Sequence, residues 1–221
     1  DSERIPNLIV IRDGARLSEI SESIIKFGVT EKELREALKN LRPPSPFVGS
    51  NLEGFLYPAM YSFTQGTEAT QILNQMLQKF QWATEGIDWG SVEGFSANEV
   101  LTIASLVESE GTPDVFGNVA RVIFNRLQIG MPLQFDSTVH YALDRRGEIR
   151  VSLKETKVAS KYNTFLNRGL PPGPIGSPTR AAFDATLNPP QGDWLYFVTV
   201  KPGETRFTSS YETFLEWKAE Y

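Results

Sequence analysis

The stretch Leu101–Gly111, LTIASLVESEG, combines an apolar run with two acids near its end. A helical step of about 100° per residue places Glu108 at the edge of the apolar arc, beside a strip of small polar residues. Partial burial there would disfavour the charged carboxylate and raise its pKa, which suits a general acid near neutral pH. The same pattern also fits a salt-bridged or solvated glutamate at a helix end, and periodicity leaves both interpretations open.

Length and composition narrow the class of protein. The 221 residues, 40% hydrophobic and 11% aromatic, can build one large domain or two small ones around a core. The formal net charge of −5 gives no sign of a nucleic-acid partner. The chain has no cysteine and a single histidine, His140, which excludes disulfides, cysteine-based metal sites and multi-histidine metal sites. We expect no metal and no cofactor, and an ordinary core or surface position for His140.

The first 65 residues have the signals of a small α+β module. Asn7–Ile11 is a short strand pattern followed by a turn, and Leu17–Ile25 has helical periodicity. A capping-box pattern starts a second helix, expected from Glu31 to about Leu41. Either Phe55–Tyr57 or Tyr61–Phe63 would supply a closing strand. With that strand, the module resembles a LysM-like carbohydrate-binding unit.

Residues 66–221 alternate helical periodicity with turn residues, which predicts a larger unit of mixed helices and strands. Arg121 and Arg126 are on the polar side of one predicted helix, and we expect both to face outward. The expected helices are 67–80, one that starts at Ser96 and carries Glu108, 119–127, 137–143, 179–187 and 211–221, with strands at 149–151 and 194–200, the second turning into a hairpin with 206–208.

Several other polar residues are candidates for a site. Glu53, in an aromatic-rich segment, fits either a functional group or a turn residue. Gln134 and Asp136 are two apart in an extended or loop segment, so their side chains would point the same way. Asp136 equally fits a helix N-cap. Tyr162–Phe165 precedes the loop Gly169–Pro178, whose prolines and glycines predict a rigid, preorganised segment.

Four stretches of the chain form one ordered set of motifs: Leu52–Pro58 with Tyr61; Ala104–Glu108; Asn125–Leu127 with Gly130–Gln134 and Asp136, Thr138, Val139 and Tyr141; and Tyr162–Thr164 followed by Gly169–Ile175. Together they resemble the MltG (YceG-like) family of endolytic murein transglycosylases, over nearly the whole chain. The resemblance implies that Glu108 is the catalytic acid and base. Glu110, the rival acid in the same segment, is roughly 200° away by helical angle. The resemblance also implies an α+β fold, with the LysM-like module at 1–65 and a mixed helix/strand catalytic domain at 66–221.

The family chemistry is cleavage of the β-1,4 bond between N-acetylmuramic acid and N-acetylglucosamine without water, which leaves a 1,6-anhydro-muramoyl end. Glycoside hydrolysis normally needs two carboxylates, whereas this reaction can use one. Glu108 would protonate the leaving oxygen and then take the proton from the C6 hydroxyl. The residues expected around the sugar, some of which could equally only fix loops, are Gln134, Asp136, Tyr162, Asn163 and Thr164, with Glu53 and Tyr61 lining or bracing the cleft.

Two other functions remain open at this point. One is a hydrolase that uses Glu108 with Asp136, and the other is a non-catalytic glycan-binding scaffold for cell-wall synthases. The resemblance implies peptidoglycan glycan strands as substrate and penicillin-binding proteins as partners. It also implies that the full-length protein has a single N-terminal membrane span and lies on the extracytoplasmic face of the bacterial cell membrane. The chain starts at Asp1 without a signal pattern, and its apolar runs are far shorter than the ~20 residues of a span, so we expect a fragment or processed form.

The sequence departs from the family pattern at three positions. Phe165 stands where tyrosine is usual, so a hydroxyl is missing. Arg206 and Phe214 are near positions where many relatives carry histidine. None of these changes alters the expectation for Glu108.

Overall fold

The computed structural model describes residues 7–146 and 151–220. These residues form eight α-helices, one 3-10 helix and two antiparallel two-stranded sheets. In chain order the elements are β1 (Leu8–Val10), α1 (Leu17–Phe27), α2 (Glu31–Asn40), β2 (Met60–Ser62), α3 (Ala69–Ala83), α4 (Ala97–Glu110), α5 (Phe116–Gln128), α6 (Asp136–Ala142), η1 (Glu155–Lys157), α7 (Arg180–Leu187), β3 (Tyr196–Lys201), β4 (Glu204–Thr208) and α8 (Tyr211–Glu220).

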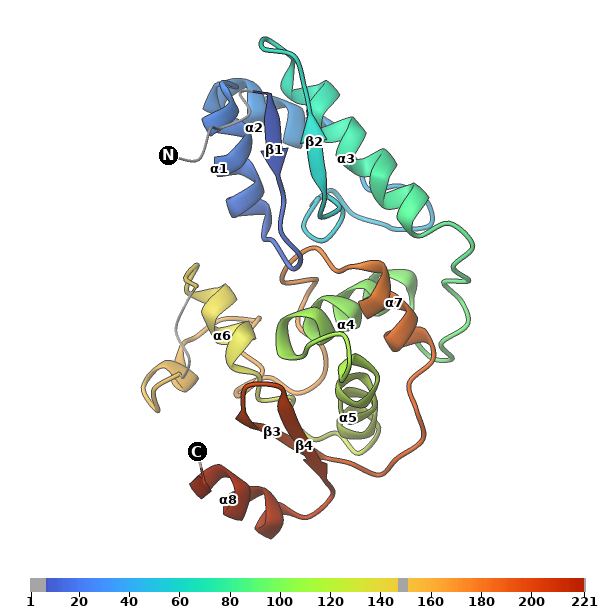
Figure 1. Ribbon diagram of the computed structural model, residues 1–221, viewed down its shortest axis with the longest axis vertical. Coiled ribbons are helices and arrows are strands. Elements are labelled where there is room, and N and C mark those ends of the chain that lie inside the picture. The colour runs from blue at the N-terminus through green and yellow to red at the C-terminus, as the bar shows by residue number, and fades with distance from the viewer. Residues whose placement is uncertain (1–6, 147–150, 221) are drawn as a thin grey trace.

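The molecule is arranged along one long axis (Figure 1). The β1–β2 sheet with α1, α2 and α3 occupies one end, and the β3–β4 hairpin with α8 occupies the other. Helices α4, α5 and α7 form the middle and pack on one another. The turn after β1 points toward this middle layer, which brings the N-terminal module next to the helix that carries Glu108.

The N-terminal module has the order β1–α1–α2–β2, which agrees with the expected strand, helix, helix and closing strand. The two strands are antiparallel, with Ile9 opposite Tyr61. Of the two candidates for the closing strand, the one around Tyr61 is correct. Phe55–Tyr57 forms turns instead, directly after Gly54, whose φ of 85° breaks an extended run. The fold class is therefore α+β.

Helix α4 lies between two hydrophobic cores. Its residues Val100–Val107 are all buried, so the helix is enclosed on every side and does not show the single apolar arc that periodicity suggests. Leu101 and Ala104 belong to a core shared with the N-terminal module and α3. Ile103 and Leu106 belong to a second core with α5 and the segment before α7. Such enclosure fixes the end of α4, where Glu108 lies.

The small polar residues of α4 are buried rather than solvated. Thr102 and Ser105 are 3% and 1% exposed. Their hydroxyls donate to backbone carbonyls one turn back, Thr102 to Asn98 at 2.8 Å and Ser105 to Thr102 at 2.7 Å. These bonds satisfy the hydroxyls inside the helix and allow close packing against neighbouring segments.

Arg126 contradicts the expectation of an outward-facing side chain. It is only 7% exposed, because the end of the chain folds back and covers that side of α5. Its Nε donates to the carbonyl of Leu195 at 2.6 Å, and its guanidinium also donates to the carbonyl of Leu133. Burial lowers the pKa of Arg126, and the carbonyls satisfy its donors.

Asp136 does not have the helix-capping position that its sequence context allows. Asp136 is the first residue of α6 and Phe135 is the N-cap, so Asp136 does not cap this helix. Its carboxylate instead accepts a hydrogen bond from the backbone N–H of Val151 at 3.2 Å. The expected strand at 149–151 falls largely outside the described residues.

Within the described ranges, no helix combines the length and apolar character needed to cross a membrane.

Candidate active site

Glu108 occupies the last turn of α4, and its side chain is half-buried. One carboxylate oxygen, Oε2, accepts two hydrogen bonds from Thr179, from the backbone N–H at 2.9 Å and from the hydroxyl at 2.7 Å. Within residues 7–146 and 151–220, no side chain or backbone group donates a hydrogen bond to the other oxygen, Oε1. The carboxyl group is therefore oriented by one oxygen and leaves the other available.

The surroundings of Glu108 favour its protonated form. Burial raises the pKa of Glu108 above its ordinary value, and the two hydrogen bonds from Thr179 act in the opposite direction. The negative charge of Asp13 also raises the pKa of Glu108. Desolvation is the largest of these effects, so the net shift is upward, as a proton donor working near neutral pH requires.

The loop that leads to Thr179 is fixed at several points. The backbone N–H of Ile175 donates to the Ser105 hydroxyl on α4 at 3.1 Å. Two residues later, Ser177 exchanges backbone hydrogen bonds with the turn after β1, donating to Ala15 at 2.9 Å and accepting from Gly14 at 3.0 Å. The Pro- and Gly-rich loop is thus tied to α4 and to the N-terminal module, and it presents Thr179 to Glu108 at a fixed place.

Glu110 has a different environment from Glu108. Its side chain is next to the first turn of α6, and burial raises its pKa to about 7. The hydroxyl and amide of Ser137 and the charge of Arg126 lower the pKa of Glu110, while the charge of Asp136 raises it. Both acids of the motif therefore have raised pKa values, and geometry must distinguish them. Glu110 faces α6, whereas Glu108 faces the start of α7.

Glu53 and Tyr61 lie inside the protein. Glu53 is 5% exposed, and its two oxygens accept hydrogen bonds from the backbone N–H of Leu17 at 2.9 Å and from the hydroxyl of Tyr141 at 3.0 Å. Burial raises the pKa of Glu53 to about 7. Tyr61 is 4% exposed and donates to the carbonyl of Tyr57 at 2.6 Å. Both side chains are buried, and Glu53 also lines a hollow together with Tyr141. Whether the two residues line the cleft or brace it stays a prediction.

Asn163 and Thr164 are also buried, at 0% and 1% exposure. The Asn163 amide donates to the carbonyls of Thr156 and Val158 at 3.0 and 2.8 Å. The Thr164 hydroxyl lies 2.9 Å from the hydroxyl of Thr138. These contacts fix the loop around 156–164 and place it against α6. A direct contact of either side chain with a sugar is therefore not what the geometry favours.

Gln134, Asp136 and Tyr162 remain accessible. Gln134 is exposed and has a positive φ of 53°, which is uncommon for a residue other than glycine. Asp136 and Tyr162 are partly exposed, and the Tyr162 ring packs 4.7 Å from the ring of Tyr141. These three side chains can still meet a ligand, and their role as sugar contacts stays a prediction.

Arg206 and Phe214 contact their own end of the chain. The Arg206 guanidinium pairs with Glu204 at 2.7 Å and with Glu220 at 2.9 Å. The Phe214 ring stacks 5.4 Å from the ring of Tyr196. Both residues therefore stabilise the β3–β4 hairpin against α8.

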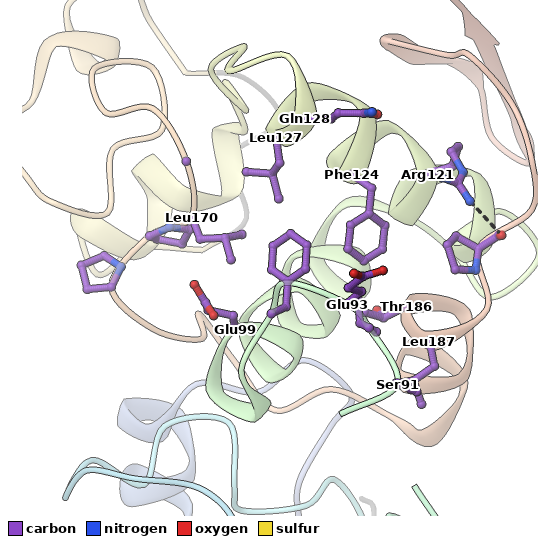
Figure 2. Close-up of a pocket in the computed structure, with 16 residues that line it drawn as sticks. Ser91, Glu93, Glu99, Arg121, Phe124, Leu127, Gln128, Leu170, Thr186 and Leu187 are labelled. Atoms are coloured by element: carbon purple, nitrogen blue, oxygen red, sulfur yellow. Dashed lines mark hydrogen bonds between the residues drawn. The ribbon is translucent and has the colours of Figure 1, made fainter. Parts of the chain in front are cut away.

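One hollow of the described part of the chain lies away from Glu108. It has a volume of about 890 Å³ and lies between the segment before α4, helix α5, the loop 169–172 and α7 (Figure 2). Its lining is mainly apolar and includes Phe95 as well as Phe124 and Leu170, the last two of which are labelled in Figure 2. A second hollow of about 420 Å³ is next to Glu53 and Tyr141. Neither is lined by Glu108, so the candidate site rests on the geometry of the acid and not on the size of a hollow.

Among the described residues, no three His, Asp or Glu side chains gather as a metal-binding group. His140 is 9% exposed, and its Nδ1 accepts from Nε of Arg145 at 3.4 Å. His140 is thus a largely buried residue of α6, with its ring paired to the following arginine.

Sequence reasoning missed three parts of the site: Thr179, Asp13 and Gly14. Thr179 has a local signal, because a threonine after a proline and before a helical pattern predicts an N-cap. That signal gives no information about which carboxylate the hydroxyl meets. The turn after β1 gave only a turn signal, and its contact with α4 depends on how the two parts of the chain pack.

Comparisons with known proteins agree with this architecture. The model of the YceG-like family matches residues 2–220. The chain is 31% identical to the endolytic murein transglycosylase of Bacillus subtilis (strain 168), over 96% of this chain and 64% of that protein. It is 35% identical to the endolytic murein transglycosylase of Streptococcus pneumoniae (strain ATCC BAA-255 / R6), over 73% of this chain and 30% of that protein.

A solved structure also matches. The fold superposes on the crystal structure of a yceG-like protein from Listeria monocytogenes with a TM-score of 0.82 and 28% identity, over 95% of this chain and 74% of that one. The chain spans less than two thirds of the length of the two curated relatives described above. The family model nevertheless covers nearly every residue. The chain belongs to the YceG-like family.

Proposed function

We propose that this protein is a peptidoglycan lytic transglycosylase with Glu108 as its single general acid and base. The observation that carries the proposal is the Glu108 carboxyl group itself. It is half-buried, oriented through Oε2 by Thr179, and available through Oε1. Burial raises its pKa, so the group can hold a proton where an ordinary glutamate would have lost it.

The reaction proceeds in two proton transfers. Glu108 first donates its proton to the glycosidic oxygen, the bond between that oxygen and C1 of N-acetylmuramic acid breaks, and the N-acetylglucosamine 4-hydroxyl leaves. The Glu108 carboxylate then takes the proton from the C6 hydroxyl as O6 bonds to C1. The products are a 1,6-anhydro-muramoyl end and a protonated Glu108, so no water is consumed and the acid is restored.

Two kinds of observation support peptidoglycan as the substrate. Curated relatives at 31% and 35% identity are named endolytic murein transglycosylases. The accessible residues Gln134, Asp136 and Tyr162 supply amide, carboxylate and phenol groups of the kind that bind sugar hydroxyls. We propose that these three contact the glycan. The buried Asn163 and Thr164 would act indirectly, by holding the loop in place.

The alternative hydrolase would pair Glu108 with Asp136. Asp136 acts electrostatically on Glu110 and accepts a hydrogen bond from Val151, and the pKa of Glu108 is instead influenced by Asp13. This favours the single-acid mechanism. The non-catalytic scaffold gives no reason for an oriented carboxyl group with a raised pKa and one free oxygen.

The cellular setting follows from the substrate. Peptidoglycan strands lie outside the cytoplasmic membrane, so we propose action on the extracytoplasmic face, with anchoring by a segment beyond this chain. Cell-wall synthases of the penicillin-binding class are the partners that would act on the same strands. The likeness of the N-terminal β–α–α–β unit to a LysM module remains a prediction, and it would add glycan affinity.

The test is digestion of purified peptidoglycan, with the products analysed by mass spectrometry. We expect 1,6-anhydro-muramoyl ends from the wild-type protein and none from Glu108→Gln, which keeps the shape of the side chain and should fold normally. Glu110→Gln is the matched control, since it removes the other acid of the motif with its similarly raised pKa. It should retain cleavage.

Three outcomes would count against the proposal. Reducing ends in place of anhydro ends would favour the hydrolase. Full activity in Glu108→Gln would exclude this acid. Glycan binding without cleavage by the wild-type protein would favour the scaffold.

A further inference from the structure

The turn after β1 packs directly on the loop that precedes α7. Gly14 and Ser177 form a backbone hydrogen bond at 3.0 Å, and Ser177 returns one to Ala15 at 2.9 Å. The approach is so close that a Cβ added at Gly176 would lie 2.4 Å from the carbonyl oxygen of Gly14. No side chain fits there without separating the two segments. The N-terminal module and the catalytic unit are therefore in backbone contact at this place.

The same turn touches the catalytic glutamate. Gly14 has a φ of 66°, and a Cβ added to it would lie 3.4 Å from Cγ of Glu108. The backbone of the turn therefore lies beside the Glu108 side chain. The preceding residue, Asp13, is exposed and carries a negative charge. One wall beside the acid thus comes from the first fifteen residues of the chain.

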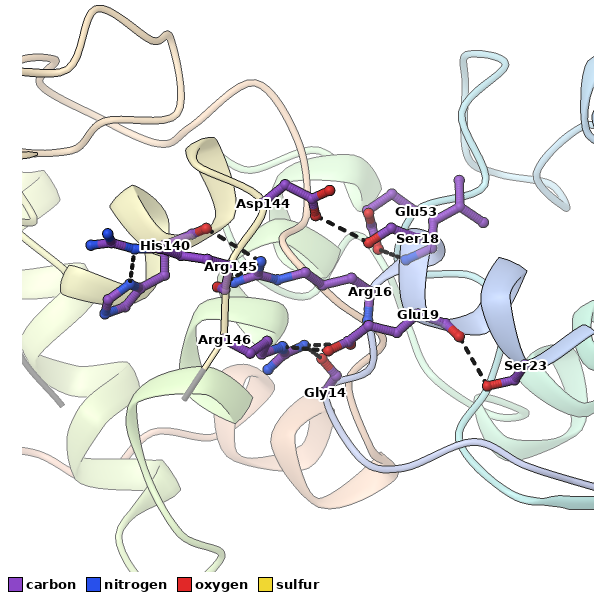
Figure 3. Close-up of polar contacts among 11 residues, drawn as sticks. Gly14, Arg16, Ser18, Glu19, Ser23, Glu53, His140, Asp144, Arg145 and Arg146 are labelled. Carbon is purple, nitrogen blue, oxygen red and sulfur yellow. Dashed lines mark hydrogen bonds and ion pairs between the residues drawn. The ribbon is translucent and has the colours of Figure 1, made fainter. Parts of the chain in front are cut away.

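Polar contacts hold the turn in place from the other side (Figure 3). Arg146, just beyond α6, donates to the Gly14 carbonyl at 2.6 Å and pairs with Glu19 at 2.8 Å. Glu19 also accepts from the backbone N–H of Arg16 at 2.8 Å. Arg16 is 5% exposed, and its guanidinium donates to the carbonyl of His140 at 3.3 Å. The start of α1 and the end of α6 are thus joined by the buried Arg16 and by the more exposed pair Arg146–Glu19.

We propose that the turn Asp13–Ala15 is an integral wall of the Glu108 site, and that Asp13 is a positioning residue whose charge acts on the Glu108 carboxyl group. The inference rests on the proposed function and deepens it. It assigns the N-terminal module a part in catalysis that is separate from any glycan affinity. Removing or displacing this module would therefore damage turnover as well as binding.

The charges around Glu108 support a specific direction for the effect of Asp13. On the α7 side the contacting residue is Thr179, which is neutral. On the α6 side Arg146 donates to the Gly14 carbonyl of the turn, and it is paired with Glu19. Asp13 thus adds a negative charge beside the acid, which raises the pKa of Glu108 and extends its protonated range to higher pH.

The first experiment measures kcat/KM against pH for Asp13→Asn. Loss of the charge should move the descending, alkaline limb of the profile to lower pH, because Glu108 then loses its proton more readily. The displacement should shrink as salt is added, since Asp13 is exposed and its charge is screened. Glu36→Gln is the matched control, an exposed acid of the same module on α2, and it should leave the profile unchanged.

The second experiment tests the wall. Gly176→Ala should push the turn away from the loop and lower kcat by about 100-fold, the loss that a displacement of about 1 Å can produce. Gly90→Ala is the control, because a Cβ there meets only ordinary contact at 3.5 Å. Should Gly176→Ala fail to fold, Asp13→Asn still tests whether this turn acts on Glu108, since an exposed charge change does not threaten the core.

The outcomes separate this inference from the proposed function. If Glu108→Gln is inactive but Asp13→Asn keeps the wild-type profile, the role of Asp13 is refuted while the function stands. A folded Gly176→Ala variant with full kcat refutes the wall. If the wild-type protein forms no anhydro ends at all, the proposed function fails and this inference fails with it.

Discussion

Thr179 donates two hydrogen bonds to a single oxygen of Glu108, one from its backbone N–H and one from its hydroxyl, at 2.9 and 2.7 Å. The same residue is the N-cap of α7, where its hydroxyl accepts from the backbone N–H of Ala182 at 3.4 Å. The start of α7 and Glu108 are therefore joined by one side chain. This arrangement orients the carboxyl group and also limits how far burial raises its pKa.

The first prediction removes the hydroxyl of Thr179. Thr179→Val keeps the shape but loses the donor that lowers the pKa of Glu108. We expect the alkaline limb of the kcat/KM profile to move to higher pH, opposite in direction to Asp13→Asn. Loss of the cap should also reduce stability by about 1 kcal/mol.

Thr179→Ser is the control for that substitution, because serine keeps both the donor and the cap. Its pH profile should match the wild type. If the valine and serine variants gave the same profile, the hydroxyl would have no influence on the acid. A shift of the alkaline limb of the kcat/KM profile to lower pH in Thr179→Val would contradict the proposed effect of the hydroxyl on the pKa of Glu108.

The second prediction concerns the pH dependence of stability. The folded pKa of Glu53 is about 7, above the ordinary value of 4.5. The folded state therefore binds more protons than the unfolded chain between these values, and its stability falls as the pH rises through this window. In Glu53→Gln, the fall in the free energy of unfolding between about pH 5 and about pH 8 should be smaller by an amount on the order of 2 kcal/mol.

Urea unfolding at several pH values measures this effect. Some slope should remain in Glu53→Gln, because Glu110 also has a folded pKa of about 7. Glu36→Gln, which changes an exposed acid, should keep the wild-type slope. An unchanged slope in Glu53→Gln would mean that this buried carboxyl does not titrate in the window.

The third prediction tests the role of Asn163 as a loop brace. Asn163→Ala leaves the carbonyls of Thr156 and Val158 without their amide donor, and the expected loss of stability is about 2 kcal/mol. Asn167→Ala is the matched control. Its amide also donates to two carbonyls, but the side chain is exposed, so water can replace it and the loss should stay below about 1 kcal/mol. If chemical unfolding showed equal losses of stability for the two variants, burial would not make the hydrogen bonds of Asn163 more stabilising than those of Asn167.

The parts of the fold that the sequence predicts are those with local signals. Thr30 accepts from the backbone N–H of Glu33 at the start of α2, and Gly28 ends α1, as their capping patterns indicate. The β3–β4 hairpin likewise follows from its strand pattern and turn at Gly203. Such signals depend on residues a few positions apart, so one sequence contains them in full.

The features that sequence reasoning misses depend on packing between distant segments. Arg126 has the spacing of an outward residue, yet the strand region around Leu195 covers it. Glu108 is recognised through its motif, but its partner Thr179 is 71 positions away and nothing near either residue connects them. The closeness of Gly14 to the same acid is likewise set by how the N-terminal module docks.

The last prediction uses two glycines to measure that docking. Gly54 has a φ of 85°, and a Cβ there would lie 2.8 Å from Cγ and 2.9 Å from Cβ of Pro174, at the beginning of the segment that leads to Thr179. Gly49 has a φ of 114° and nothing within 4 Å of an added Cβ. Alanine at either position carries the strain of a positive φ, but only at Gly54 does it also meet Pro174.

We therefore expect Gly49→Ala to lower stability by about 1 kcal/mol and Gly54→Ala by about 3 kcal/mol. Gly54→Ala should also reduce turnover, because displacement of Pro174 shifts the loop that holds Thr179 against Glu108. Thermal unfolding and anhydro-end formation, measured on the same samples, give both quantities. Equal destabilisation by the two substitutions would show that the contact with Pro174 can relax at no cost. If turnover fell in Gly49→Ala and not in Gly54→Ala, this would contradict the proposal that displacement of Pro174 is transmitted through the loop to Glu108.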